Sequence, residues 1–467
     1  DFATRDQYRD EIETLARTAD LVELDVARSA LALAQSARQA TELSRISIVA
    51  GNGDFLAENL DMPRSCHIGY YLLSEGRAVL EQRVGCRPPL RTTQQRWVLA
   101  HPALVYLGSI SLLAAAVVAI SVAYAADADG SQWLIGLAGL LALIPAMTLA
   151  VDVVNWVITR LLSPHVLPKL DFAQGIPPSC RTMVVVPALI ANTSDVASLL
   201  NQMELHYLRN PDPNLGFALL SDYADAPEQT MPEDAALLAD AESGIAALNH
   251  KYPNFPFYLF HRRRLWNPAE GVWMGWERKR GKLHEFNRLL RSDPNTSHIV
   301  RLGDQALLPQ VRYVITLDAD TILPREQAQQ LIGTLAHPLN RARFDARSGK
   351  VVAGYSVLQP RTEIKPMSAN QSLFTQIFAG DVGIDLYSRA VSDLYQDLFG
   401  AGSYVGKGIY AVDAFEQSLD GRVPENSLLS HDLFEGMHGR VGLVNDIVLY
   451  DEYPTHYLVN FKRAHRW

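Results

Sequence analysis

The 467-residue chain contains few cysteines and no excess of positive charge. Its three cysteines are isolated and form no CxxC pair, so we expect neither a disulfide framework nor a structural zinc site, which suits a reducing compartment. Lys and Arg number 42 against 51 Asp and Glu, giving a net charge of −9, which argues against a dedicated nucleic-acid-binding protein. With 48% hydrophobic and 20% charged residues, the composition excludes extended disorder and fibrous rods, and the length suits two or three domains.

Two long uncharged runs stand out from this average composition. Residues 103–125 and 133–151 contain no charged side chain, and only residues 126–132 separate them. Each run is long enough to cross the hydrocarbon core of a bilayer as a helix, at about 1.5 Å per residue. We expect a transmembrane helical hairpin. The alternative is a pair of helices buried in the core of a soluble protein.

Basic residues lie on both outer sides of this hairpin and are missing from its loop. Arg83, Arg87, Arg91 and Arg96 precede the first run, Arg160 and Lys169 follow the second, and the loop carries only Asp127 and Asp129. The positive-inside bias therefore predicts that both chain ends face the cytoplasm and that the loop lies outside. The expected division is an N-terminal helical cytoplasmic region at 1–100, two spans within 101–158, a proline-rich linker at 159–180, and a second folded domain at 181–467.

Short apolar runs alternate with helical patterns in this second domain. We expect strands at 183–187, 217–222, 257–260, 313–318 and 351–355, with helices at 193–207, 233–251 and 281–291. Such alternation predicts an α/β fold with an open sheet, in which ligands bind at the carboxyl ends of the strands. Two of the predicted strands end in an acidic residue, Asp222 and Asp318, where a nucleotide would lie.

Three acidic residues are the main candidates for chemistry. Asp318 and Asp320 follow the clearest strand, and two carboxylates beside an open cleft suit Mg²⁺ or Mn²⁺ with a diphosphate completing the coordination. An ordinary turn is the alternative, because Asp is common after strands. Asp432 lies among Leu and Phe residues, where partial desolvation makes a carboxylate usable as a general base, although it could instead cap the next helix.

Three further segments carry candidate ligand-binding residues. Arg466 could neutralise a diphosphate and Trp467 could stack on a sugar ring, or the two could anchor the chain at a membrane interface. Lys282 could hold phosphates, and a solvated helix face is the alternative. The glycine-rich segment 402–408 either forms a tight turn or lets the backbone approach a bulky acceptor, through Gly402, Ser403 and Tyr404.

The order of these motifs resembles that of the processive, membrane-embedded inverting glycosyltransferases of the cellulose and hyaluronan synthase type. In that group a nucleotide-binding Asp, a DxD motif, a catalytic Asp and a QxxRW motif follow one another. The matching positions here are Asp222, Asp318 with Asp320, Asp432, and residues 463–467. Arg463 stands where Gln is usual, so acceptor contacts cannot be carried over at that position.

A closer resemblance is to the cyclic β-1,2-glucan synthases, and it extends over nearly the whole chain. It is carried by the strings at residues 273–282, 402–410, 451–454 and 465–467. The resemblance implies a GT-A-like (Rossmann-type) glycosyltransferase domain at 181–467, UDP-glucose as donor, a divalent cation, a glucan acceptor and a bacterial inner membrane. It also implies a phosphorylase-like domain elsewhere in the same polypeptide. Because the chain starts at Asp1 and stops after Trp467, we expect a piece of a longer protein, truncated at the C-terminal end of this domain.

The mechanism that this resemblance implies is a direct displacement with inversion at the anomeric carbon. Asp222 would contact uridine, and Asp320 would be the chief ligand of the metal, with Asp318 contacting the ribose or the metal. Lys282 and Arg466 would contact the diphosphate, and Asp432 would accept the proton of the acceptor 2-hydroxyl. Two other functions stay open. A sugar nucleotidyltransferase would need a glycine- and arginine-rich loop after the first strand, which residues 186–192 do not provide. A non-catalytic scaffold for polysaccharide export would not bind UDP in the presence of manganese.

Overall fold

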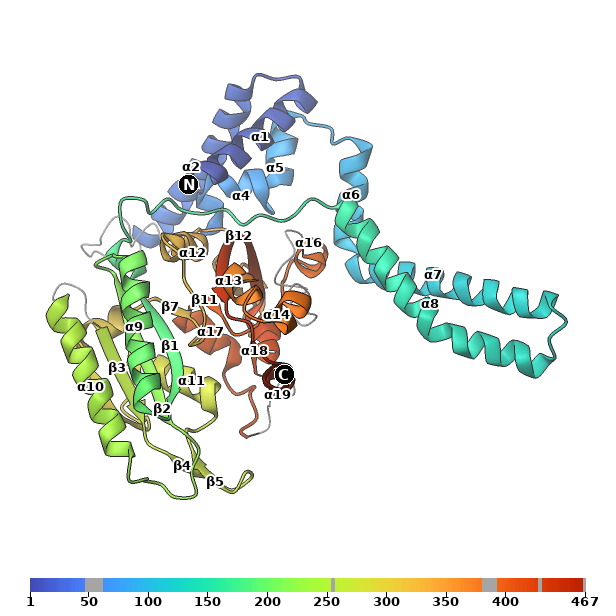
Figure 1. The fold of residues 1–467 in the computed structure, drawn as a ribbon. Helices are drawn as coiled ribbons and strands as arrows, with labels where there is room; N and C mark the ends of the chain where they lie inside the picture. The colour runs from blue at the N-terminus through green and yellow to red at the C-terminus, as the bar shows by residue number, and fades with distance from the viewer. Residues whose placement is uncertain (47–61, 253–256, 380–392, 427–430, 465–467) are drawn as a thin grey trace. The chain divides into compact units, whose positions relative to one another are not determined.

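The computed structural model describes residues 1–46, 62–252, 257–379, 393–426 and 431–464 (Figure 1). The chain divides into two compact units. One comprises residues 1–85, 166–390 and 402–467, and the other comprises residues 86–165 and 391–401. The larger unit holds the α/β sheet together with the N-terminal helices, whereas the smaller unit holds the two apolar helices.

The smaller unit is built around a helical hairpin. Its helices are α6 (Leu90–Ala100), α7 (Pro102–Asp127), α8 (Gln132–Leu161) and α16 (Leu394–Phe399). In length and composition α7 and α8 could each cross a membrane, and only 11% of the most apolar stretch of either helix is buried. They lie side by side, and the Tyr106 hydroxyl donates to Asn155 Oδ1 at 3.0 Å. Helix α8 continues beyond the predicted 133–151 because Asp152 ends the uncharged run without ending the helix.

The N-terminal helices pack on one another within the larger unit. They are α1 (Phe2–Ala19), α2 (Glu23–Ile46), the short 3₁₀ turn η1 (Arg64–Cys66), α4 (Ile68–Leu73) and α5 (Arg77–Val84). The buried apolar side chains of this group include Leu15, Val26, Ala30, Leu72 and Leu80. Tyr8 connects the group to the α/β part, because its hydroxyl lies 3.1 Å from His337 Nε2.

Among the described residues, an eight-stranded mixed sheet forms the centre of the larger unit, in the order β12-β10-β11-β7-β1-β2-β3-β6. Strand β1 pairs in parallel with β2 and β7, β2 with β3, and β10 with β12, whereas β11 and β6 run antiparallel to their neighbours. The predicted α/β sheet is therefore confirmed. The strands are β1 (Thr182–Ile190), β2 (Leu215–Tyr223), β3 (Phe257–Arg262), β6 (His298–Leu302), β7 (Tyr313–Thr316), β10 (Val357–Ile364), β11 (Gly408–Ala411) and β12 (Val441–Asp451).

Two small hairpins lie outside this sheet. One pairs β4 (Leu265–Asn267) with β5 (Val272–Met274), and the other pairs β8 (Arg343–Phe344) with β9 (Val351–Ala353). The apolar run predicted as a strand at 351–355 is therefore strand β9 of a separate hairpin. The next strand of the main sheet is β10, which directly follows it in the sequence.

Helices cover both faces of the main sheet, and this explains why its central strands β1, β2, β3 and β7 are largely apolar. On one face Val184 and Val186 of β1 pack with α9 (Thr193–Arg209), α10 (Asp234–Lys251) and α12 (Gln327–Ala336). On the other face Met183 and Val185 pack with the 3₁₀ helix η3 (Gln305–Gln310), α11 (Arg278–Leu290) and α17 (Val412–Leu419). The remaining elements are η2 (Pro178–Cys180), α13 (Pro366–Ala369), α14 (Leu373–Phe378), α18 (Asp432–Gly439) and α19 (Tyr457–Ala464).

Candidate active site

Asp222 lies near the end of β2 and is buried, with 1% of its surface exposed. Arg262, at the end of the neighbouring strand β3, donates from Nε and Nη2 to the two carboxylate oxygens at 2.8 Å each. Lys282 of α11 places its Nζ 3.2 Å from the same carboxylate. Burial by itself would raise the pKa of Asp222, but the charges of Lys282 and Arg262 outweigh it and lower that pKa. The carboxylate is thus ionised and held by two cations.

Lys282 is part of the interior of the domain and not of a solvated helix face. It is 3% exposed, and its Nζ donates to the Ala188 carbonyl at 2.6 Å, just beyond the middle of β1. Burial lowers the pKa of Lys282 to about 8. Arg262 also pairs with Glu285 at 3.0 Å, so four charged side chains form one buried network. Whether this network contacts a nucleotide stays a prediction.

Asp318 lies directly beyond β7, with its side chain 28% exposed. Its Oδ1 is 2.6 Å from Lys279 Nζ, and its Oδ2 is 3.3 Å from Lys407 Nζ. Burial would raise the pKa of Asp318, but Lys279 and Lys407 bring it down to about 2. The Thr321 amide donates to the Asp318 carbonyl at 3.0 Å, so Asp320 lies within a turn. Both acidic side chains, those of Asp318 and Asp320, are only partly buried. The turn therefore leaves them accessible to a ligand, and the two interpretations of this segment do not exclude each other.

Lys407 and Asp451 form a buried ion pair behind Asp318. Lys407 immediately precedes β11 and is 4% exposed, and its Nζ contacts Asp451 Oδ2 at the end of β12. The Thr321 hydroxyl donates to the other oxygen of Asp451 at 2.6 Å. Although burial would lower the pKa of Lys407, Asp318 and Asp451 raise it. This fixed ammonium group therefore stays charged at neutral pH and faces Asp318.

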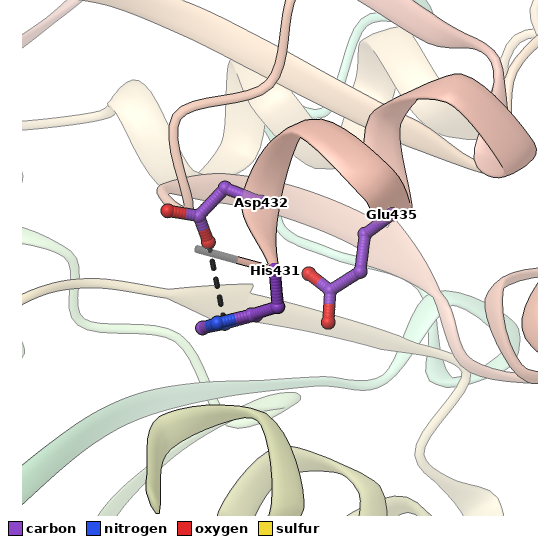
Figure 2. A group of neighbouring side chains, drawn as sticks. All are labelled: His431, Asp432 and Glu435. Atoms are coloured by element: carbon purple, nitrogen blue, oxygen red, sulfur yellow. Dashed lines mark ion pairs between the residues drawn. The ribbon is translucent and has the colours of Figure 1, made fainter. Parts of the chain in front are cut away.

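Asp432 begins α18 and lies beside two other titratable side chains (Figure 2). His431 Nε2 is 3.3 Å from Asp432 Oδ1, and Glu435 follows one helical turn later. The potential ligand atoms of the three residues all lie within 4.8 Å of one another. Asp432 is 7% exposed and Glu435 is 3% exposed. Burial, followed by the charge of Asp432, raises the pKa of Glu435 well above its usual value, so this carboxyl group favours its protonated form more than a free glutamate does.

Lys279 and Gly406 connect the surroundings of Asp318 to those of Asp432. Besides Asp318, Lys279 Nζ donates to the Gly406 carbonyl at 2.8 Å. Gly406 has a φ of +78°, and a Cβ added there would lie 2.6 Å from Asp432 Oδ1. Two carboxylates more than a hundred residues apart in the sequence are therefore linked through one short backbone segment, Asp318 by way of Lys279 and Asp432 by direct proximity.

The glycine-rich segment and the C-terminal residues complete the list of predicted site residues. The Gly402 amide donates to the Val441 carbonyl at 2.8 Å, and Ser403 follows it. Tyr404 is 4% exposed and packs in the core, so it has no open ring face to offer an acceptor. A contribution of this segment to an acceptor site stays a prediction. Arg466 and Trp467 lie outside the described residues.

Sequence analysis missed four charged residues that surround the predicted acids: Arg262, Lys279, Lys407 and Asp451. Lys279 and Lys407 occur inside strings that were noted for other reasons, a basic run and a glycine-rich turn. Asp451 ends an apolar run, as Asp222 and Asp318 do. The same signal, an acid that ends a strand, was therefore available for Asp451.

The chain was compared with known proteins. Over its whole length, in an alignment of 475 residues, it is 42% identical to cyclic beta-(1,2)-glucan synthase NdvB of Rhizobium meliloti (strain 1021), and it spans 16% of that protein. No protein-family model matches the chain. Among solved structures, the chain is similar to the crystal structure of mannosyl-3-phosphoglycerate synthase from Rubrobacter xylanophilus. The alignment covers 67% of this chain and 80% of the synthase chain, at 13% sequence identity and a TM-score of 0.29. A structural similarity this low carries no argument about function.

Proposed function

We propose that the chain is a glycosyltransferase region that acts in cyclic glucan synthesis. The proposal rests on the similarity of the whole chain to one segment of a cyclic β-1,2-glucan synthase, a relation that its motifs predicted. The reaction we assign is transfer of glucose from UDP-glucose to the 2-hydroxyl of a growing β-1,2-glucan, with inversion. One observation supports it most directly: Lys279 joins Asp318 to the Gly406 carbonyl, and the Asp432 carboxylate lies against the same glycine. A donor site and a base must be this close for direct displacement.

The residues around Asp318 suit a divalent cation with a diphosphate. Asp318 offers two ionised oxygens and Asp320 follows in the same turn, and such hard oxygen donors are the ligands that Mg²⁺ and Mn²⁺ prefer. When bound, the cation would offset the negative charge that develops on the leaving diphosphate. Lys279 and Lys407 add positive charge at the same place. Asp222 and Lys282 are assigned to the uridine and phosphate side, with Arg466 and Trp467 completing the site from the C-terminus.

Asp432 is the proposed general base. The raised pKa of Glu435 favours its protonated form, which cannot take the proton of the acceptor, so we assign that role to Asp432. The Asp432 side chain lies at the first residue of α18, next to Gly406. As the acceptor oxygen attacks the anomeric carbon, its proton moves to an Asp432 carboxylate oxygen, and the bond to the diphosphate breaks.

An Asp432→Asn substitution in the full-length protein tests this assignment. Loss of general-base help should lower glucose transfer about 10²–10⁴-fold. Binding of UDP in the presence of Mn²⁺, measured by calorimetry, should stay within about twofold because the amide is nearly the same size. Asp413→Asn is the matched control, because the Asp413 side chain is 77% exposed and pairs with Arg291 at the surface. Transfer at the control rate by the Asp432→Asn protein would remove Asp432 from the mechanism.

The two apolar helices support a membrane location. We assign α7 and α8 as a transmembrane hairpin in the bacterial inner membrane, with the loop outside and the sheet domain in the cytoplasm. In a chain whose three native cysteines are replaced by Ser, Ser131→Cys should react with a membrane-impermeant maleimide added to spheroplasts. Asp171→Cys, in the linker, should react only after permeabilisation. Labelling of both from the same side would contradict the hairpin.

A non-catalytic scaffold for polysaccharide export is the second candidate, because the same hairpin would anchor it. Binding of UDP separates the two functions, since a scaffold would bind none in the presence of Mn²⁺. The related synthase is far longer than this chain, so we place the phosphorylase-like domain that the resemblance implies in another part of the polypeptide.

A further inference from the structure

The carboxylate of Asp318 has a lysine on each of its two oxygens. Lys279 Nζ lies 2.6 Å from Oδ1, and Lys407 Nζ lies 3.3 Å from Oδ2. A divalent cation that binds this carboxylate would come within contact distance of two ammonium groups. Like charges at such distances repel strongly, so at least one lysine has to move away when the cation binds.

The two lysines are held very differently. Lys407 is 4% exposed and is fixed by Asp451, which is itself 5% exposed and bonded to Thr321. The Lys279 side chain is 24% exposed, and its other described bond is to a neutral acceptor, the Gly406 carbonyl. Moving Lys407 would leave a buried carboxylate unpaired, whereas moving Lys279 gives up one ion pair and one neutral hydrogen bond.

The backbone before Lys279 has an unusual conformation that fits movement at this point. Glu277 and Arg278 precede it at the start of α11, and their φ values are +51° and +48°. Two consecutive side-chain-bearing residues in the left-handed region are strained, and such strain concentrates at ligand sites and switch regions. A relaxed start of α11 would carry Lys279 to a different position.

We propose that Lys279 is an exchangeable counter-ion of the donor site. Without donor it neutralises Asp318, and when a divalent cation occupies that carboxylate it moves to the diphosphate of the bound sugar nucleotide, while Lys407 stays with Asp451. This inference rests on the proposed glycosyltransferase function. It assigns Lys279 as a group that contacts the donor and that also keeps the metal site weak until a nucleotide arrives.

The test is a Lys279→Met substitution, with Mn²⁺ alone and Mn²⁺ with UDP as the probes. Electron paramagnetic resonance measures the concentration of free Mn²⁺. By this measure Lys279→Met should bind Mn²⁺ alone at least about tenfold more tightly than the unchanged chain, because the competing ammonium group is gone. At saturating Mn²⁺, UDP should bind about tenfold more weakly, because its diphosphate has lost a partner. Lys251→Met is the matched control, since Lys251 pairs with Glu204 on the surface at 2.5 Å and should change neither affinity.

The outcomes separate this inference from the proposed function. If the unchanged chain does not bind UDP in the presence of Mn²⁺, the proposed function fails. If it does, but Lys279→Met binds Mn²⁺ no more tightly, or binds UDP as well as the unchanged chain, the exchange is refuted. Lys279→Gln provides a second variant should the Met substitution prevent folding, because its amide can still donate to the Gly406 carbonyl. It should show the same rise in metal affinity.

Discussion

A methyl group at Gly406 should separate nucleotide binding from transfer. In Gly406→Ala the added Cβ would lie 2.6 Å from Asp432 Oδ1, so the carboxylate has to retreat by about 1 Å to reach ordinary van der Waals contact. A misplacement of about 1 Å in a reacting group can cost about 10²-fold in rate. We therefore expect about a hundredfold slower glucose transfer, although the charge of Asp432 is unchanged.

Gly421→Ala is the control for the loss of stability that comes from placing an alanine at a positive φ. Gly421 has a φ of +64°, and a Cβ there meets no atom within 4 Å. Each substitution forces an L-residue into the left-handed region, which costs about 1–2 kcal/mol, so both variants should lose similar thermal stability. Only Gly406→Ala should lose transfer.

The assay is the initial rate of labelled glucose incorporation by membranes that contain the full-length protein, with UDP binding measured in parallel. UDP binding in Mn²⁺ should be within about twofold for both variants. Equal transfer rates for Gly406→Ala and Gly421→Ala would refute the reasoning, because Asp432 would then not need its position beside Gly406.

The charged network and the metal requirement give further expectations. Asp222→Asn should lower the free energy of unfolding by about 3–5 kcal/mol in denaturant titrations, because buried Arg262 and Lys282 lose their shared partner. Since burial lowers the pKa of Lys282 from 10.5 to about 8, the unfolded chain holds this proton at higher pH than the folded chain. The stability that Lys282 contributes should therefore rise between about pH 8 and pH 10.5, by about 3 kcal/mol, and Lys282→Met should lack this rise. Chelation with EDTA should abolish UDP binding in calorimetry, and added Mn²⁺ should restore it.

The central strands could be predicted because each is a continuous apolar run. Burial on both faces requires such runs in β1, β2, β3 and β7. Strands β10 and β12 interrupt the pattern with polar residues and, in β10, with Pro360 at a register shift. Short β11 follows a glycine-rich segment. The pairing of β10, β11 and β12 depends on contacts between residues that are distant in the sequence, and a local sequence pattern does not reveal such contacts.

The candidate site divides in the same way. Asp222 and Asp318 could be found because each stands where an apolar strand ends, which is a local signal. The lysines could not, because Lys279 and Lys282 lie three residues apart on α11 and yet pair with different acids from different strands. The order of the strands in the sheet determines which lysine pairs with which carboxylate. The spacing of residues along the sequence does not reveal this.

Strand β12 has a consequence for biosynthesis. Among the described residues it is the strand nearest the C-terminus, it pairs with β10, and its final residue Asp451 is a buried counter-charge for Lys407. While the ribosome has not yet released residues 441–451, β1, β2, β3 and β7 can already associate, but Lys407 then has Asp318 to pair with and lacks its buried partner Asp451. The Lys407–Asp451 pair beside Asp318 thus forms only after residues 441–451 have joined the sheet next to β10.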